Sequence, residues 1–326
     1  MLADAAPITA PDQDAAQAAL TASAEAGTGR LRDLGSWIAA CQGTCPPQLL
    51  ERCRVVVFAG DHGIASRGVS LLPEGHSVDR AAEISSGAGT VNVLARAAGA
   101  SVRIVDISLD HEAWGDERVS RSTGVIDTED AMDAEQFARA VEIGRRVADQ
   151  EIDSGADLLI PGDLGAGNTT VAAAVLGAFT GTEPVAVVGP GAGYTDELWK
   201  IKVEAIRDAM FRSRGLSDEP EEVLRRIGSP DLVALTAFIA QAAARRTPML
   251  LDGAPVAVAA YLAERFSPGT RAWCQAGQLT PEPAHLIALQ ALDLTPLVAL
   301  DMNAGQGTGA LAALPLVQAA AALLAD

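Results

Sequence analysis

The chain has 326 residues, of which 49% are apolar, so it is long enough for one large or two modest domains with a sizeable core. Its formal net charge of −18 argues against a nucleic-acid surface, because binding a polyanion requires clustered Lys and Arg side chains. The N-terminus lacks a basic region followed by an apolar run, and no later segment offers about 18 uninterrupted apolar residues, so we expect a soluble cytoplasmic protein with no membrane partner.

Residues 1–27 form a variable N-terminal segment rich in Ala, Asp and Gln, in which we expect an amphipathic helix. A second helix is predicted over 30–41, where apolar residues recur at helical spacing. Cys41 and Cys45 then form a C-x3-C pair, but no second pair or nearby His completes a zinc set. These thiols are predicted to be structural or incidental, with metal binding and redox use as the alternatives.

From residue 54 onward, short apolar runs alternate with stretches of helical pattern. The apolar runs are 55–58, 102–105, 158–160, 185–188 and 249–251, and the helical stretches include 81–98, 134–154 and 170–179. Near-continuous apolar strands separated by helices indicate an α/β fold with a parallel, Rossmann-like sheet flanked by helices on both faces. Ligands of such sheets bind at the carboxyl ends of the strands.

The third apolar run leads into a glycine-rich turn that opens onto an alanine-rich helix. Gly162, Gly165 and Gly167 let the backbone turn sharply and bring its N–H groups close to a ligand. Asn168 and Thr169 follow where a helix leaves its first N–H groups unpaired. The turn is neither a Walker A loop nor a dinucleotide fingerprint. It predicts a phosphate site, with a tight connection that binds nothing as the alternative.

Glycine-rich or acidic turns also follow the other predicted strands. They are Asp61-His62-Gly63, Asp106, Gly189-Pro-Gly-Ala-Gly193, Asp252-Gly253 and the late Gly305-Gln-Gly-Thr-Gly309, which opens the final helix. Because the carboxyl ends of parallel strands meet at one edge of a sheet, these turns together predict a nucleotide or sugar-phosphate site.

Several motifs, in the same order along the chain, resemble the nicotinate-nucleotide:dimethylbenzimidazole phosphoribosyltransferase family. They are Phe58-Ala-Gly-Asp-His-Gly63, Gly87-Ala-Gly-Thr-Val-Asn-Val-Leu-Ala95, Gly162-Asp-Leu-Gly-Ala-Gly-Asn-Thr-Thr170, Leu251-Asp-Gly253, Pro281-Glu-Pro-Ala-His285 and Leu300-Asp-Met-Asn-Ala-Gly-Gln-Gly-Thr-Gly-Ala310. The resemblance runs from about Gly27 to the C-terminus. It implies transfer of ribose 5-phosphate from nicotinate mononucleotide to 5,6-dimethylbenzimidazole or a related base, with release of nicotinate and inversion at the anomeric carbon. The product would be α-ribazole 5′-phosphate, used for the lower ligand of cobalamin.

The resemblance also implies the organisation of the protein. One phosphoribosyltransferase unit is expected over 28–320, and two copies are expected to form a homodimer. Within the unit, a large α/β domain would span about 54–265, and a smaller helical domain would combine about 28–53 with 280–326. Nicotinate mononucleotide already carries a cationic leaving group, so no pyrophosphate needs a metal, and neither a metal nor a cofactor is expected.

Mapped onto this chain, the resemblance assigns roles to residues of the predicted turns. Phosphate and ribose contacts fall to Gly165, Gly167, Asn168, Thr169, Gly191 and Gly193, and further substrate contacts fall to Asp61, Ser70, Glu74, Asp252, Gly305 and Gly307. Simpler roles are also open for three motif residues. His62 would hold two loops together, Asp252 would cap the helix that follows it, and His285 would order a loop or a helix start.

Two departures from the family pattern affect the predicted chemistry. The family's general base is a glutamate in a Gly-Glu-Gly turn, and this chain has Gln306 at that position. An amide can orient the acceptor but cannot take its proton. Asp163 replaces a glutamate usual in the turn before Gly-Asn-Thr-Thr, which keeps the charge but shortens the reach by one methylene.

Three hypotheses follow from these departures. In the first, Glu74 or Asp163 supplies the missing carboxylate. The alternative for Glu74 is a solvated loop acid with no role in catalysis. In the second, the acceptor is another azole, a purine or a phenol, or a partner in a hetero-oligomer supplies the carboxylate. In the third, the chain is a nucleotide-binding paralogue without catalysis.

Overall fold

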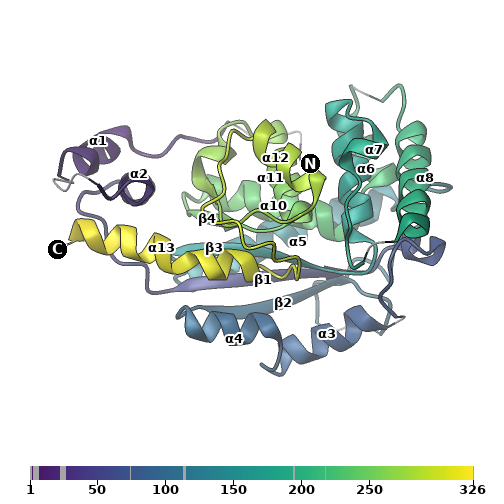
Figure 1. Cartoon of the computed structure of the whole chain (residues 1–326), viewed down its shortest axis with the longest axis horizontal. Helices are drawn as coiled ribbons and strands as arrows, with labels where there is room; N and C mark the ends of the chain where they lie inside the picture. The colour runs from purple at the N-terminus through teal and green to yellow at the C-terminus, as the bar shows by residue number, and fades with distance from the viewer. Residues whose placement is uncertain are drawn as a thin grey trace.

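The computed structural model describes Leu2 and residues 7–22, 27–73, 75–112, 115–193, 195–216 and 218–325. A five-stranded sheet crosses the molecule in the order β2-β1-β3-β4-β5, with all neighbouring strands parallel (Figure 1). The strands are β1 (Cys53–Gly60), β2 (Ser101–Ser108), β3 (Leu158–Leu164), β4 (Met249–Leu251) and β5 (Cys274–Ala276). The predicted α/β fold with a parallel sheet is therefore confirmed.

Helices precede, separate and follow these strands along the chain. They are α1 (Gln13–Ala22), α2 (Arg30–Gln42), α3 (His76–Ser85), α4 (Thr90–Ala97), α5 (Ala134–Asp153), α6 (Asn168–Thr180), α7 (Pro184–Val187), α8 (Asp196–Arg212), α9 (Pro220–Ile227), α10 (Pro230–Ala244), α11 (Ala254–Phe266), α12 (Pro283–Ala291) and α13 (Thr308–Ala325), with short 3-10 helices η2 (Gly63–Arg67) and η3 (Thr270–Trp273). The helices predicted over 30–41, 134–154 and 170–179 correspond to α2, α5 and α6, and the helix expected in the first 27 residues is α1.

The sequence of β1 explains why helices cover both faces of the sheet. Val55, Val57 and Ala59 join one buried cluster with residues of α3, α4 and α13, whereas Val56 and Phe58 join another with residues of α5, α10 and α11. Successive side chains of a strand point to opposite faces, so the apolar run from Val55 to Ala59 is buried on both. Figure 1 shows α3 and α4 on one side of the sheet and α5, α10 and α11 on the other.

The prediction of a strand over 185–188 is wrong, because most of this segment belongs to the short helix α7. Pro184 occupies the first turn of α7, where its fixed φ and missing N–H suit a helix. Four apolar residues are too few for periodicity to distinguish a strand from a helical turn. The fifth strand is instead β5, whose three residues Cys-Gln-Ala carry no apolar run.

The continuous helix predicted over 81–98 is also wrong at its centre. The chain leaves the helical conformation after Ser85, and α4 begins only at Thr90. Gly87 lies between the two helices with a φ of +81°, a left-handed conformation that glycine adopts without steric cost. This break separates α3 from α4, and residues of both helices line the candidate site.

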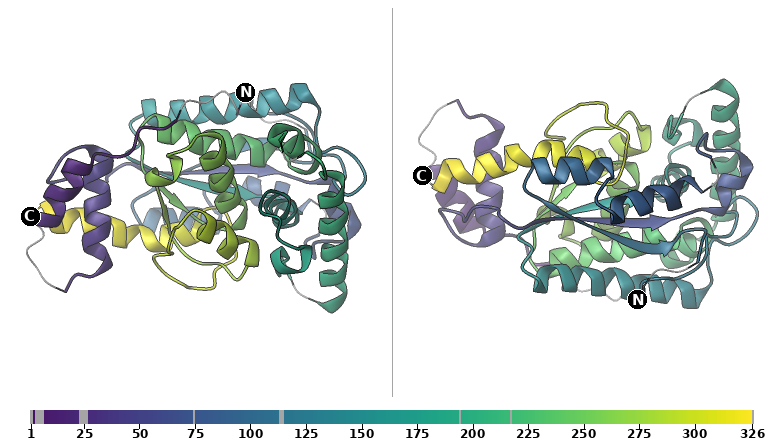
Figure 2. Two further views of the ribbon diagram at one scale, coloured as in Figure 1. Left: turned by 90° about the horizontal axis from the view of Figure 1, so that it is seen from above. Right: turned by 90° about the horizontal axis from the view of Figure 1, so that it is seen from below.

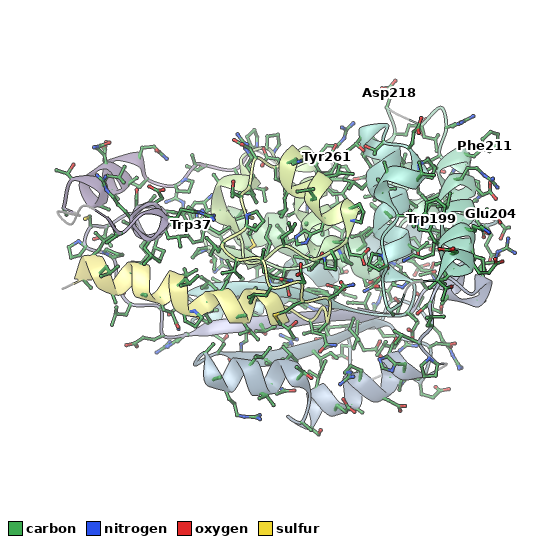
Figure 3. The ribbon with its side chains drawn as sticks, viewed as in Figure 1. Trp37, Trp199, Glu204, Phe211, Asp218 and Tyr261 are labelled. Carbon is green, nitrogen blue, oxygen red and sulfur yellow. The ribbon has the colours of Figure 1, made fainter. Side chains whose placement is uncertain are left out.

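Helices from the two ends of the sequence pack together beside the sheet. Helix α1 packs on α2, and α2 packs on α13, as the views in Figures 1 and 2 show. Trp37 of α2 points toward the centre of the molecule (Figure 3) and donates its Nε1–H to the carbonyl of Ala272 at 3.0 Å. Helix α12, in contrast, packs mainly on α11. The division into a large and a small domain stays a prediction.

Among the described residues, α13 alone is long and apolar enough to cross a membrane by length and composition. Half of this helix is buried inside the protein, and it packs against α2, α4, β3 and β4. These contacts are those of a core helix, and its first turn lies at the edge of the sheet where the candidate site forms.

Candidate active site

A cavity of about 310 Å³ lies at the carboxyl ends of β3 and β4, between the glycine turn (residues 162–168), α3 and the turn before α13. Nine of the predicted site residues line it, namely Ser70, Asp163, Gly165, Gly167, Asn168, Thr169, Gly191, Gly305 and Gln306. The lining does not include Asp61, Gly193, Asp252 and Gly307, which lie around it. Glu74 lies outside the described residues, so the hypothesis that it supplies a carboxylate stays a prediction.

The glycine turn directs the start of α6 into this cavity. Gly167 precedes α6 with a φ of +88°, and a Cβ on it would lie 3.0 Å from Ile64. A Cβ on Gly165 would clash with the carbonyl of Gly60, so the turn packs directly on the end of β1. The N-terminus of a helix carries partial positive charge, so this arrangement suits an anion in the cavity. The N–H of Thr169 donates to the side chain of Asn168, and those of Thr170 and Val171 donate to the carbonyl of Gly167.

Asp163 is the buried acid at the floor of the cavity. Its Oδ2 accepts a hydrogen bond of 2.7 Å from the Nδ2 of Asn168, whereas its buried Oδ1 has no partner among the described residues. Burial raises the pKa of Asp163 to about 7, the nearby charges of Asp252 and Asp231 add to this rise, and His62 opposes it. Asp163 therefore changes its protonation near neutral pH.

Gln306 lies in a strained turn against the same strand. Its φ is +62°, and the neighbouring Gly305 and Gly307 also have positive φ values. The backbone N–H of Gln306 donates to the carbonyl of Asp163 at 3.0 Å, and a Cβ on Gly162 would lie 2.6 Å from the carbonyl carbon of Gln306. A left-handed conformation in a residue other than glycine persists only where its surroundings fix it, which is common at functional sites.

Asp252 holds the end of this turn in place. It is 1% exposed, and its two oxygens accept from the N–H of Gly309 at 2.7 Å and the Nε2 of Gln278 at 3.2 Å. Gly309 lies in the first turn of α13, so the expectation that Asp252 caps the helix after it is wrong. The sheet brings α13 over the end of β4, and the side chain caps that distant helix instead. Burial raises the pKa of Asp252 to about 6, although these hydrogen bonds oppose the rise.

Asp61 and His62 fasten the glycine turn from the β1 side. The N–H of Ala166 donates to Asp61 Oδ1 at 3.2 Å and to the hydroxyl of Ser77 at 3.0 Å. The ring Nδ1 and the backbone N–H of His62 both contact the carbonyl of Ala166, at 2.9 and 3.2 Å. The interpretation of His62 as a residue that holds two loops together is thus confirmed by its contacts.

His285 orders the start of α12, as its simpler interpretation expects. Its Nδ1 lies 3.2 Å from the backbone N of Thr280, which donates to it, and 2.9 Å from the Thr280 hydroxyl. Burial lowers the pKa of His285 to about 4, so the ring is neutral at physiological pH.

Sequence reasoning gave no role to two buried charged residues that shape the loop 189–193. Glu282 is 3% exposed, and its Oε1 accepts from the N–H of Gly191 at 2.6 Å and from the Nδ2 of Asn303 at 3.1 Å. The Nζ of Lys202 donates to the carbonyl of Gly189 at 2.8 Å. Burial lowers the pKa of Lys202, while the charge of Glu282 opposes this shift. Glu282 lies within a recognised motif, but its burial depends on tertiary packing.

Among the residues that the structure describes, no group of three or more His, Cys, Asp or Glu side chains is arranged to hold a metal ion. Cys41 and Cys45 are free thiols, and burial raises the pKa of Cys41. The cavity thus combines backbone donors suited to an anion, a carboxyl group that titrates near neutrality and a polar amide at Gln306.

Comparisons with known proteins identify the family to which this chain is similar. A family model described as Phosphoribosyltransferase matches residues 7–326. The chain is 62% identical over 297 residues to the nicotinate-nucleotide–dimethylbenzimidazole phosphoribosyltransferase of Corynebacterium efficiens, a match that covers 91% of this chain and 81% of that protein. It is 51% identical over 331 residues to the protein of the same name from Mycobacterium ulcerans, covering 98% and 92%. A crystal structure of the enzyme so named from Thermus thermophilus matches with a TM-score of 0.89, at 34% identity over 96% of each chain.

Proposed function

The chain belongs to the nicotinate-nucleotide–dimethylbenzimidazole phosphoribosyltransferase family, and we propose that it transfers ribose 5-phosphate from nicotinate mononucleotide to 5,6-dimethylbenzimidazole. Membership makes the protein a pentosyltransferase and links it to cobalamin synthesis. The observation that carries the proposal is the cavity in which the N-terminus of α6 and the carboxyl group of Asp163 lie together. The products are nicotinate and α-ribazole 5′-phosphate, formed with inversion at the anomeric carbon.

In this proposal the 5′-phosphate of nicotinate mononucleotide binds at the N-terminus of α6. Backbone N–H groups of the glycine turn and the side chains of Asn168 and Thr169 contact it, and the loop around Gly191 contacts the ribose. The charge of the chain supports this assignment, because an acidic protein binds a phosphate best through local backbone dipoles. The cavity volume of about 310 Å³ lies at the lower end of the range for small-molecule sites.

Asp163 takes the proton of the incoming base in this proposal. One nitrogen of dimethylbenzimidazole forms the new bond to the anomeric carbon, and the proton on the other nitrogen passes to the carboxylate. The bond to nicotinate breaks with its electron pair moving to the pyridinium nitrogen, which becomes neutral. A pKa of about 7 suits a general base at neutral pH, whereas the amide of Gln306 orients the base by hydrogen bonding.

Nicotinate release from purified protein tests the proposal. The wild type should release nicotinate from nicotinate mononucleotide only when dimethylbenzimidazole is present. Asp163→Asn should slow this release by about 10²- to 10⁴-fold, the usual contribution of a general base, and Gln306→Glu should raise it by less than about tenfold. Asp153→Asn, which neutralises an exposed acid on α5, is the matched control and should leave the rate unchanged.

The other hypotheses give different results in the same assay. Absence of nicotinate release with any acceptor contradicts the proposal and favours a nucleotide-binding paralogue. Release with another azole, a purine or a phenol, but not with dimethylbenzimidazole, favours an altered acceptor. A rise of about 100-fold or more in Gln306→Glu would place the missing base at that turn rather than at Asp163.

We also propose that two copies associate as a homodimer in the cytoplasm. Exposed apolar side chains on adjacent helices support this association, namely Leu316 and Leu323 of α13 and Val93 of α4. Sedimentation velocity of the purified protein should give the mass of two chains, and a single-chain mass at micromolar concentration contradicts it.

A further inference from the structure

Behind the glycine turn, a second and much smaller cavity separates Asp163 from a buried His–Asp pair. Its volume is about 10 Å³, and His62, Asp163, Asn168 and Asp231 line it together with apolar side chains such as Phe58. A space of this size admits at most about one water molecule, so little solvent separates the groups that line it. Asp163 lines both this cavity and the larger one.

The contacts of His62 favour its protonated form. Its Nδ1 lies 2.9 Å from the carbonyl of Ala166, and its Nε2 lies 3.1 Å from Oδ1 of Asp231. Both partners accept hydrogen bonds, and a neutral imidazole has only one N–H to donate. Burial lowers the pKa of His62, but the charge and hydrogen bond of Asp231, the Ala166 carbonyl and the charge of Asp61 together raise it above its ordinary value. The raised pKa of His62 favours the form in which the pair is a buried cation beside a buried anion.

Charged groups face Asp163 from three elements of the fold. Asp252 lies at the end of β4, Asp231 lies in the first turn of α10, and His62 follows β1, while α6 contributes the neutral amide of Asn168. Asp163 itself is 5% exposed, and its unpartnered Oδ1 receives no hydrogen bond from the described residues that would fix its charge. In such a buried site, interactions between charges are strong because little water screens them.

We propose that His62 and Asp231 are positioning residues for Asp163: the cation of His62 favours its carboxylate form, and the anion of Asp231 favours its protonated form. The pair thereby sets the pH at which Asp163 is ready to accept a proton. The catalytic meaning of this inference rests on the proposed function, in which Asp163 receives the proton of the incoming base. The electrostatic relation among the three residues is measurable without turnover.

Two substitutions should move Asp163 in opposite directions. His62→Gln removes the cation, so the pKa of Asp163 should rise by about one unit or more, and Asp231→Asn removes the anion, so it should fall by a similar amount. If His62 also loses its proton in Asp231→Asn, the loss of its positive charge opposes the fall, which is then smaller. His111→Gln is the matched control, since His111 contacts Asp106 in another His–Asp pair that does not line the small cavity.

The experiment uses two measurements on the full chain. The first is an infrared titration of the Asp163 carboxyl band, identified by its loss in Asp163→Asn. The second is the pH dependence of single-turnover nicotinate release, whose rise with pH should move up in His62→Gln, move down in Asp231→Asn and stay in place in His111→Gln. If His62→Gln does not fold, Asp231→Asn alone decides, because a purely structural role predicts no downward shift.

The outcomes separate the inference from the function on which it rests. Infrared shifts in opposite directions support the inference, and identical or absent shifts overturn it even if activity is lost. Opposite infrared shifts with an unchanged pH dependence of the rate support the electrostatic relation but contradict the role of Asp163 as proton acceptor.

Discussion

Replacing Asp163 by asparagine should stabilise the protein relative to the wild type, and the gain in unfolding free energy should be larger at neutral pH than at acidic pH. The folded state holds the pKa of Asp163 at about 7, whereas the ordinary value is 3.8. Between these values the folded chain binds a proton that the unfolded chain lacks, so the stability of the wild type falls as pH rises. The asparagine side chain has nearly the same shape but no charge to bury, so the variant does not lose this stability.

The size of the effect follows from the two pKa values. A shift from 3.8 to about 7 gives a cost of roughly 4 kcal/mol once Asp163 is fully ionised, because each pKa unit corresponds to about 1.36 kcal/mol. Most of this cost appears between pH 5 and pH 8, where linkage predicts that the wild type loses about 2.5 kcal/mol that the variant keeps. The substitution that abolishes the proposed proton transfer should therefore stabilise the fold at pH 8.

Urea denaturation of the wild type and Asp163→Asn at each pH unit from 5 to 8 measures this difference. The gap between their unfolding free energies should widen steadily up to about pH 7 and then level off. Asp153→Asn, an exposed control, should show a gap that does not change with pH. A constant gap between wild type and Asp163→Asn would refute the reasoning, since it would mean that Asp163 keeps one protonation state throughout.

Substitutions at three further positions test the residues that form or hold the loops around the cavity. Gly191→Ala places a Cβ 2.7 Å from the Nζ of Lys202 at a φ of +55°, so the KM for nicotinate mononucleotide should rise while the fold persists; an unchanged KM would exclude this loop from the substrate site. Glu282→Ala leaves the N–H of Gly191 without its acceptor and should raise the same KM by about tenfold or more, whereas Glu282→Gln, which keeps an oxygen there, should change it less. Asp252→Ala removes the cap on Gly309 and should lower the unfolding free energy by about 1–3 kcal/mol in urea denaturation at pH 5, below the raised pKa of about 6, where burying the charge of Asp252 adds little cost; a loss below about 0.5 kcal/mol would contradict the capping role.

The strands that the sequence predicts correctly are those that contain a continuous run of apolar residues. Runs such as 55–58 and 158–160 contain only apolar residues, most of them β-branched or leucine, and they form the buried centre of the sheet. The strand β5 has no such run, because three residues at the sheet edge need only the hydrogen bonds of one parallel neighbour and a covering layer. The misassigned segment 185–188 fails for the converse reason, since its apolar residues satisfy a helical turn equally well.

The candidate site likewise has features that the sequence shows and contacts that only the folded chain creates. Glycines of the turn after β3 are visible in the sequence because tight turns and close backbone contacts require them locally. The partners of Asp252 and Glu282 are not visible, since Asp252 contacts Gly309 and Glu282 contacts Gly191, both far away along the chain. Only the folded sheet brings these segments together, so the sequence places such acids near the site without showing what they hold.

The proposed substrate, considered as a whole, explains why acidic side chains lie beside a proposed phosphate site. Nicotinate mononucleotide carries a phosphate at one end and a pyridinium cation at the other, and the site offers a helix N-terminus and the acids Asp163, Asp231 and Asp252. In the proposed reaction, transfer removes the positive charge from the pyridinium ring, and in the same step the proton of the base neutralises Asp163. The charge near the acids therefore stays nearly constant through the reaction, so this buried region needs little reorganisation as the bond to nicotinate breaks. A glutamate at position 306 would add a further negative charge to this region, which gives a physical reason why an amide is compatible with catalysis by Asp163.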